Sequence, residues 1–479
     1  MVRLSNFKFI YVIAVIYLLI LPVYSQVETP KWTLDKVQEE EAYSIGTQAY
    51  LYYVAPFMMY SVLYQSQRVP YFEYKDGMPF NTWTKVSDLG NPQNTKQVMP
   101  NVNTLYASSW LDLRKEPIVL EIPRVGDRYY SVAMMDAYMN NFRILGSRTV
   151  GPYGGKFLIC SKDYNGIIPD DMQKVIAPTP MIWVLQRIAP IFTNAIEVDE
   201  CKKIQNAINI TPLSQYGKNE YDMMRYNEKL DLGVPDISND PLKFFEIANE
   251  FVHINRPPEA DKGVLSLFAR LNLGPDYKFR AEDLTPAQRT GLLRGMEAGK
   301  ELINTYLLKG DYTFNGWILP VKDGGNYGTN YLLRAAYTMQ NIGILSPDEA
   351  LYLTSYVDID GNEYDGKNSY ILHFDKDKLP RVDAFWSITL YELPSILLYE
   401  NSIKRYQIGP QIEQMVYNSD GSLDIYIQHD SPKDKNKIGN WLPSPKGKFA
   451  LTIRLYNPKV DMLTIGKGYT EIPSLKIIK

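Results

Sequence analysis

The sequence contains little histidine and little cysteine, and these shortages argue against a metal centre. Its 479 residues include three histidines, at positions 253, 373 and 429, and two cysteines. Protein sites for zinc and other transition metals rely heavily on histidine and cysteine ligands. Glu250 and His253 have helical spacing, but a ferritin-like centre needs a second such pair and further carboxylates. We therefore expect no metal site in this protein.

Common catalytic and cofactor-binding motifs are also missing. The sequence holds no G-x-S-x-G, H-E-x-x-H, C-x-x-C, Walker A or G-x-G-x-x-G motif. Its 51 basic and 54 acidic residues give a net charge of −3, without the basic excess that is typical of nucleic-acid binding. We expect no cofactor and no nucleic-acid partner.

The N-terminal 25 residues have the pattern of a signal peptide. Arg3 and Lys8 precede an apolar run over residues 9–21, and Ser25 ends a segment that fits a cleavage site. A membrane span needs about 20 apolar residues, so this run is too short, and no later stretch is long enough. An uncleaved anchor is the alternative. We expect a secreted or luminal protein with no stable membrane insertion after cleavage.

The two cysteines, Cys160 and Cys201, allow two interpretations. In an oxidising compartment they have the opportunity to form a disulfide. They fit buried free thiols equally well, because Cys160 directly follows the apolar residues 157–159. The sequence leaves both open.

Residues 26–194 are predicted to form an N-terminal helix followed by a β-sandwich. Thr33 is a suitable N-cap for a helix that continues to Pro56. Short strands separated by turn residues follow, which is typical of a sandwich or barrel. The clearest predicted strands are residues 103–113, 118–122, 129–135 and 156–159.

Residues 195–310 are predicted to be a helical segment. The expected helices cover residues 197–208, 241–253, 262–271 and 286–308. The last has the strongest start signal, because Thr285 and Gln288 form a capping box around Pro286.

Residues 311–479 are predicted to form a jelly-roll-like domain. Expected strands cover residues 368–374, 383–391, 423–428 and 449–456, and Ser346 with Glu349 predicts one helix. The strands at 423–428 and 449–456 alternate apolar and polar residues, which predicts half-buried antiparallel strands joined by the long connection 429–448. The fold class is therefore α+β, with two β-sandwich or jelly-roll-like domains, a helical segment between them and an N-terminal helix.

Several motifs resemble a known pair of domain families. PNVNTLYASSWLDL (100–113), RYYSVAMMDAYMNNF (128–142) and APTPMIWVLQR (177–187) resemble the N-terminal domain of unknown function numbered 1254. YGTNYLLRAAY (327–337), DAFWSITLY (383–391) and NWLPSPKGKFALTIRLYNP (440–458) resemble its usual C-terminal companion, numbered 1214. The resemblance implies a sandwich-like domain, a helical segment and a jelly-roll domain, and it implies no reaction. One departure is Asn103, where that family often has aspartate.

A catalytic site is best sought at the end of the strand 423–428. His429 can transfer protons near neutral pH, and a carboxylate such as Asp430 could orient it. Because neighbouring strand residues point to opposite faces, we expect a further partner from Arg334, Asp383 or Tyr391. The alternative is that His429 and Asp430 only satisfy the loop backbone.

A ligand site is a second hypothesis, on carboxamide and aromatic side chains that hydrogen-bond and stack. Its candidates are Asn101, Asn103, Tyr106, Trp110 and Trp441, although the asparagines could instead form turns. Three functions follow: a secreted protein that binds a small polar or glycan ligand near the domain junction, a cofactor-independent hydrolase that uses His429 with a carboxylate, or a structural protein that assembles into homo-oligomers. We favour the first.

Overall fold

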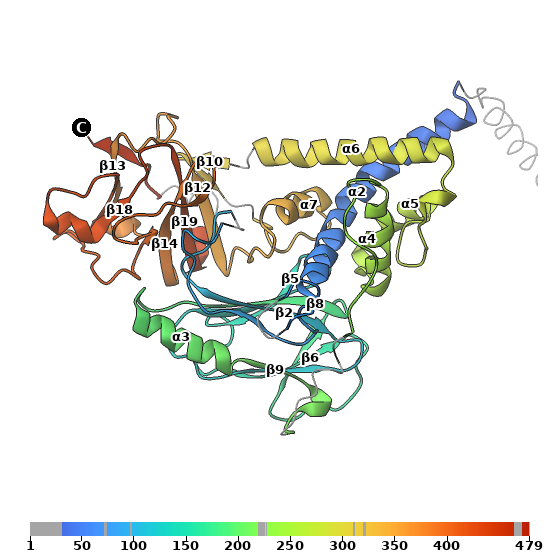
Figure 1. The fold of residues 1–479 in the computed structure, drawn as a ribbon, viewed down its shortest axis with the longest axis horizontal. Coiled ribbons are helices and arrows are strands. Elements are labelled where there is room, and N and C mark those ends of the chain that lie inside the picture. Colours follow the sequence, from blue (N-terminus) through green and yellow to red (C-terminus); the bar gives the residue numbers. More distant parts are fainter. Residues whose placement is uncertain are drawn as a thin grey trace, which may run out of the picture.

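The computed structural model describes residues 31–70, 74–95, 98–218, 226, 228–309, 312–319, 322–463 and 472–478. The predicted signal peptide lies outside these ranges. Figure 1 shows a pair of sheets formed by residues 84–212, a helical block above them, and a second group of sheets at the C-terminal end. The α+β class expected from the sequence is confirmed.

The two N-terminal sheets share one apolar core, to which Val132 and Val184 contribute from the first sheet and Leu120 and Phe157 from the second. The five-stranded sheet has the order β1 (Thr84–Val86), β2 (Leu105–Asp112), β8 (Met181–Ile188), β4 (Tyr130–Met135) and β5 (Asn141–Gly146). The four-stranded sheet has the order β7 (Gln173–Ala177), β6 (Gly155–Ser161), β3 (Ile118–Ile122) and β9 (Asn209–Pro212). Helix α3 (Ala195–Ala207) adds Cys201 to this core.

The helical block covers part of the outer face of the five-stranded sheet. It contains α2 (Leu34–Ser66), α4 (Lys243–Ile254), α5 (Lys262–Phe268), α6 (Pro286–Lys309) and α7 (Tyr331–Gln340). The capping box of α6 is confirmed: Thr285 Oγ1 accepts from Gln288 N at 3.2 Å, and Gln288 Oε1 accepts from Thr285 N at 3.0 Å. The sequence predicts helix α2 as part of the N-terminal domain. In the structure α2 crosses α6 closely, and a Cβ at Gly291 would lie 2.1 Å from the carbonyl oxygen of Glu39.

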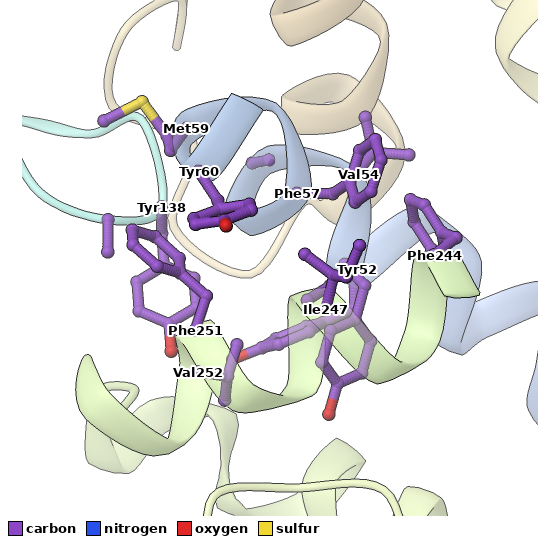
Figure 2. Close-up of a cluster of buried hydrophobic side chains, with 14 of the residues drawn as sticks. Tyr52, Val54, Phe57, Met59, Tyr60, Tyr138, Phe244, Ile247, Phe251 and Val252 are labelled. Atoms are coloured by element: carbon purple, nitrogen blue, oxygen red, sulfur yellow. The ribbon is translucent and has the colours of Figure 1, made fainter. Parts of the chain in front are cut away.

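The core of the helical block is built largely from aromatic residues of α2 and α4 (Figure 2). Tyr52 and Tyr53 are fully buried, and each hydroxyl donates to a carboxylate or amide oxygen, of Asp261 and Asn249 respectively, at 2.9 Å. Because their polar ends have partners, these tyrosines bury their rings without leaving an unpaired hydroxyl.

The C-terminal sheets share a second core, which includes Trp386, Ile425 and Leu455. The seven-stranded sheet has the order β10 (Tyr312–Phe314), β11 (Trp317–Leu319), β12 (Ala350–Ser355), β19 (Phe449–Pro458), β14 (Val382–Glu392) and β15 (Leu397–Leu398), and β16 (Gln407–Ile408) also pairs with β14. The four-stranded sheet has the order β18 (Trp441–Pro443), β17 (Leu423–Gln428), β13 (Ser369–Phe374) and β20 (Lys476–Ile478).

The strands on either side of the long connection 429–448 do not pair with each other. Strand β17 pairs with β13 and β18, whereas β19 pairs with β12 and β14. The connection is long because it leads from one sheet to the other and contributes β18 on the way. The antiparallel pairing predicted for the two strands is confirmed, with β13 for β17 and with β12 and β14 for β19.

The helix predicted to begin after Ser346 does not form. Ser346 accepts a backbone hydrogen bond from Glu349, but the chain then enters β12 (Ala350–Ser355) instead of continuing as a helix. The Glu349 side chain is fully buried and bonds to Arg148 and Tyr129, which replaces its role in a capping box. Within the described ranges, every helix is too short or too polar to cross a membrane.

Candidate functional site

The five-stranded and seven-stranded sheets meet through their outer faces at the junction of the N-terminal and C-terminal parts. All ten residues of β19 are buried. Leu455 belongs to the core between the C-terminal sheets, whereas the ring of Tyr456 lies 4.9 Å from that of Tyr129 in the N-terminal part. The alternation in β19 therefore marks one apolar and one largely polar face that are both covered, and the predicted half-burial of this strand is wrong.

Arg187 and Tyr106 form the N-terminal side of this polar junction. They are paired across β8 and β2, so their side chains lie on the same face of the sheet. Arg187 Nε donates to the Tyr106 hydroxyl at 3.3 Å, and Nη2 donates to the carbonyl of Gly343 at 3.0 Å. The third nitrogen, Nη1, is buried and has no hydrogen-bond partner among the described residues.

Arg454 of β19 forms the C-terminal side. Its Nη1 donates to Thr389 Oγ1 at 2.8 Å, and its Nη2 donates to the Tyr391 hydroxyl at 2.6 Å. Tyr391 in turn donates to the carbonyl of Pro100 at 2.9 Å, which links the two parts of the chain. Tyr352 pairs with Arg454 across β12 and β19, and its hydroxyl makes no hydrogen bond to a described residue.

Asn101 joins the two sides. Its Oδ1 accepts from the backbone N–H of Asn103 at 2.7 Å, which fixes the orientation of the amide. Its Nδ2 then donates to the hydroxyls of Tyr106 at 3.0 Å and Tyr456 at 2.8 Å. We call the resulting group the arginine–tyrosine cluster, which comprises Asn101, Tyr106, Arg187, Tyr352, Tyr391, Arg454 and Tyr456.

The cluster contains two buried positive charges without a carboxylate partner. Arg187 and Arg454 are each 4% exposed, and neither forms an ion pair with a described aspartate or glutamate. Glu349 is a buried carboxylate of the same junction, but it already accepts from Arg148 Nε at 2.8 Å and from the Tyr129 hydroxyl at 3.0 Å. Buried charges are normally paired with an opposite charge, so the cluster has an excess of positive charge.

The phenol groups respond to these charges differently. Burial raises the pKa of Tyr352 to about 12 and also raises the pKa of Tyr391. Burial acts in the same direction on Tyr106, but the charge and hydrogen bond of Arg187, together with Thr104 and the charge of Arg454, outweigh it, so the pKa of Tyr106 is lowered. Asn101, Tyr106 and Tyr352 are only half-buried, so water or a small ligand can contact them.

Two of the predicted ligand-binding residues, Asn101 and Tyr106, belong to the cluster. Asn103 lies beside it, fully buried, where Nδ2 donates to Gln411 and Oδ1 accepts from Ser387. The two predicted tryptophans lie elsewhere.

Trp110 and Trp441 are both enclosed by protein, at 4% exposure each. Trp110 stacks on Trp183 in the core of the helical block, with ring centroids 6.1 Å apart. Trp441 donates from Nε1 to the carbonyl of Gln428 in the C-terminal part. The structure does not bring either tryptophan to the cluster.

The predicted catalytic residues are distributed over separate places. His429 is half-buried, and its Nδ1 lies 2.9 Å from the carbonyl of Ser444. Asp430 is exposed, and Asp383 is exposed and pairs with Lys459 at 3.4 Å. No contact joins His429 to either carboxylate in the part of the chain that the structure describes.

Arg334, the fourth catalytic candidate, lies on α7 inside the helical block. Its guanidinium carbon is 4.8 Å from the ring centroid of Tyr52, 5.0 Å from Tyr331 and 5.4 Å from Tyr138. It is 1% exposed and donates from Nη2 to the carbonyl of Tyr52. These contacts give Arg334 a packing role among aromatic residues, away from His429.

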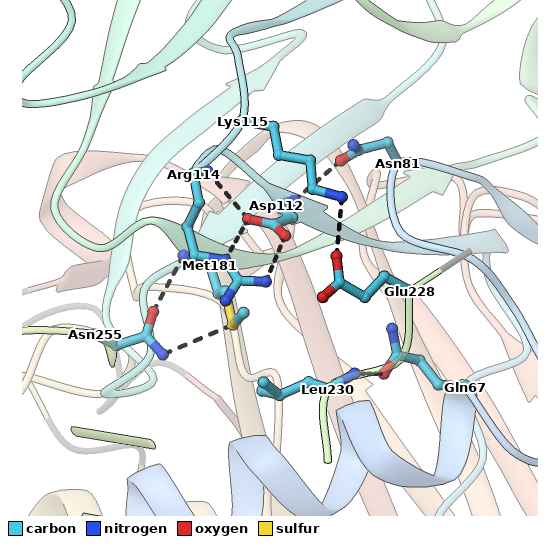
Figure 3. Close-up of polar contacts among 9 residues, drawn as sticks. All are labelled: Gln67, Asn81, Asp112, Arg114, Lys115, Met181, Glu228, Leu230 and Asn255. Carbon is cyan, nitrogen blue, oxygen red and sulfur yellow. Dashed lines mark hydrogen bonds and ion pairs between the residues drawn. The ribbon is translucent and has the colours of Figure 1, made fainter. Parts of the chain in front are cut away.

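A cavity of about 460 Å³ lies on the N-terminal sheets, lined by Leu113, Arg114, Lys115, Glu116, Pro117, Ser161, Asp163, Tyr164, Leu213 and Ser214. Figure 3 shows the polar contacts beside it. Arg114 donates from Nε and Nη2 to the carboxylate of Asp112, and Lys115 pairs with Glu228 at 3.0 Å. Its basic groups already have acidic partners, so this cavity offers a weaker ligand site than the cluster.

The described residues contain no group of three or more histidine, cysteine or acidic side chains that could hold a metal ion. Cys160 and Cys201 are both free thiols and both buried, so they do not form a disulfide.

The sequence motifs did not identify four residues of the cluster, namely Arg187, Tyr352, Arg454 and Tyr456. A signal was present, because Arg187 and Arg454 are the single charged residues within the strands MIWVLQRI and FALTIRLYNP. Charged residues are rarely buried without a partner, so a lone arginine in a buried strand indicates a special site.

Comparisons with known proteins agree with the order of the two sheet-forming regions. Residues 80–212 match the family described as "Protein of unknown function (DUF1254)", and residues 349–460 match "Protein of unknown function (DUF1214)". None of the curated proteins matches the chain.

Two solved structures cover most of the chain. The crystal structure of the VPA0106 protein from Vibrio parahaemolyticus is 23% identical, covers 91% of this chain and 100% of its own, and has a TM-score of 0.71. An uncharacterized protein from Burkholderia cenocepacia is 10% identical, covers 93% of this chain and 96% of its own, and has a TM-score of 0.42. The first shares the fold. The chain therefore contains a domain of unknown function 1254 followed by a domain of unknown function 1214.

Proposed function

We propose that the protein binds a small polar ligand that carries a carboxylate or a comparable oxyanion, and that the arginine–tyrosine cluster is the binding site. The observation that carries this proposal is the burial of Arg187 and Arg454 without a carboxylate partner. An oxyanion between the two sheets would supply the missing negative charge.

The free donors of the cluster support an oxyanion as the ligand. Arg187 Nη1 and the hydroxyl of Tyr352 have no partner among the described residues, and both can donate hydrogen bonds. Charge-assisted hydrogen bonds from guanidinium to an oxyanion are about twice as strong as neutral ones. A neutral glycan would leave the positive charges unbalanced, so we favour an anion over a neutral sugar.

The other two functions have less support. A hydrolase that uses His429 needs an orienting carboxylate, and the described contact of its Nδ1 is to a main-chain carbonyl. Assembly into homo-oligomers rests on analogy with other jelly-roll proteins alone.

We also propose that residues 1–25 direct secretion and are removed, and that the paired sheets are of the β-sandwich and jelly-roll types. The n-region and apolar run support the first proposal, and the shared core of each pair of sheets supports the second. The mass of the protein purified from its natural compartment tests removal of the segment.

Thermal denaturation in the presence of acetate, phosphate, sulfate and neutral sugars tests the binding site. An anion at 100 times its Kd adds about 2.7 kcal/mol of stability, which corresponds to a rise in Tm of roughly 5–10 °C for domains of this size. We expect Arg187→Gln and Arg454→Gln to lose this rise. Arg148→Gln is the matched control, because Arg148 lies at the same junction but pairs with Glu349 and Asp348.

Two results would contradict the proposal. One is that none of the anions raises Tm in the unsubstituted protein. The other is that both cluster variants keep the full anion-dependent rise that Arg148→Gln shows.

A further inference from the structure

The Tyr106 hydroxyl is surrounded by donors in a way that the other phenols of the cluster are not. Its oxygen accepts from Asn101 Nδ2 at 3.0 Å and from Arg187 Nε at 3.3 Å. The side chain of Thr104 also acts on this hydroxyl and lowers the pKa of Tyr106. By contrast, Tyr391 accepts from Arg454 and donates to the carbonyl of Pro100. Two donors directed at one phenol oxygen stabilise the phenolate relative to the phenol.

We propose that Tyr106 is the proton-accepting group of this site and takes a proton from an O–H or C–H group of the bound oxyanion ligand. This inference rests on the proposed function, because the ligand must bind between the two arginines. In the step, the ligand's O–H or C–H bond breaks and its electron pair stays on the ligand. The proton forms a new O–H bond with the Tyr106 phenolate, so no oxidant or other reactant is needed.

Positively charged residues of two strands act on Tyr106. Arg187 of β8 lies with its guanidinium carbon 5.1 Å from the centroid of the Tyr106 ring, and Arg454 of β19 also lowers the pKa of Tyr106. The same arginines would stabilise the negative charge that the ligand gains when it loses its proton.

Apart from the two arginines, phenols are the titratable groups beside Tyr106 in the cluster. Tyr352, Tyr391 and Tyr456 face it from the C-terminal sheet, and burial raises the pKa of each, so they remain neutral where Tyr106 ionises. On the neighbouring strand β1, Lys85 pairs with Ala107, so it lies on the opposite face of the sheet from Tyr106, and its amine donates to Asn206 of α3 at 3.2 Å. Among the described tyrosines with a shifted pKa, Tyr106 alone has it lowered.

The ultraviolet absorbance of phenolate, followed against pH in the ligand-free protein, tests this assignment. We expect one tyrosine to ionise below the ordinary tyrosine pKa of about 10. Tyr106→Phe should lose this early phase, and Arg187→Gln should move it to higher pH. Tyr391→Phe is the matched control, because it removes a phenol from the same cluster and should keep the early phase.

A second titration with inorganic phosphate connects Tyr106 to the ligand. An anion bound beside the phenolate should move the early phase to higher pH, and the shift should disappear in Arg454→Gln. The assignment is refuted if the unsubstituted protein shows no early phase, if Tyr106→Phe keeps it, or if phosphate that binds leaves it unmoved. The ligand-free titration tests the ionisation of Tyr106, and the anion-dependent rise in Tm tests the binding site. Each proposal can therefore fail without the other.

Discussion

Replacing Arg187 with methionine should leave the ligand-free protein as stable as before or make it more stable. Arg187 is 4% exposed, and it donates a hydrogen bond to the carbonyl of Gly343 at 3.0 Å and a longer one to the Tyr106 hydroxyl at 3.3 Å. Losing a hydrogen bond to a charged group costs about 1.5–3 kcal/mol. Keeping an unpaired ion out of water costs several kcal/mol, and well-packed apolar replacements of buried ions are often neutral or stabilising by about 1–4 kcal/mol. The two effects nearly cancel, with a balance that favours methionine.

Arg148→Met should have the opposite effect at the same junction. It leaves the fully buried carboxylate of Glu349 with the Tyr129 hydroxyl as its remaining side-chain partner. Breaking a buried pair costs about 3–5 kcal/mol. Arg148 is 31% exposed, so water can replace part of the guanidinium, and we expect a loss near the low end of that range.

Thermal denaturation of the two methionine variants in an anion-free buffer measures the difference. At roughly 2–4 °C per kcal/mol, Arg148→Met should lower Tm by about 6–12 °C, while Arg187→Met should leave Tm unchanged or raise it. If Arg187→Met lowers Tm as much as Arg148→Met does, Arg187 is a structural residue of the junction. The cluster would then not be an anion site.

Two further predictions concern the helical block and the C-terminal surface. Gly291→Ala should lower Tm, because overpacking against the backbone of Glu39 costs about 1–3 kcal/mol. This cost exceeds the gain in helix propensity of about 1 kcal/mol. Gly263→Ala on α5 is the control: a Cβ there meets no atom within 4 Å, so this substitution should raise Tm. His373 donates to Asp424 from Nδ1, and this hydrogen bond raises the pKa of His373. The stability that this hydrogen bond adds should therefore be complete below the unfolded pKa of about 6.5 and be lost as pH rises through the folded pKa. An NMR titration measures the pKa of His373, and a value that Asp424→Asn leaves unchanged would contradict the prediction.

The strands and helices were largely predictable because their signals are local. Alternation of apolar residues identified β17 and β19, and the capping box at Thr285 identified the start of α6. A local signal fails where distant residues compete for the same side chain. Ser346 and Glu349 have the spacing of a capping box, yet the Glu349 carboxylate binds Arg148 and Tyr129, which are about 200 residues away in the sequence.

The candidate site was predictable only in part, because a strand pattern shows that two faces differ but not what covers them. Asn101 and Tyr106 were recognised from their residue types, one just before a predicted strand and one within it. Arg187 and Arg454 gave a weaker signal, as single charges within buried strands. Their proximity depends on how two domains dock, which no local pattern records.

The docking of the two domains also explains why the cluster is suited to bind a ligand. Asn101 donates across the junction to Tyr456, and Tyr391 donates across it to the carbonyl of Pro100, so the domains are held in register without a ligand. The donors that remain free, Arg187 Nη1 and the Tyr352 hydroxyl, lie one on each side. A ligand that satisfies both would add contacts to an interface that is already formed. Binding should therefore require little rearrangement, and its free energy should appear directly as added stability of the junction.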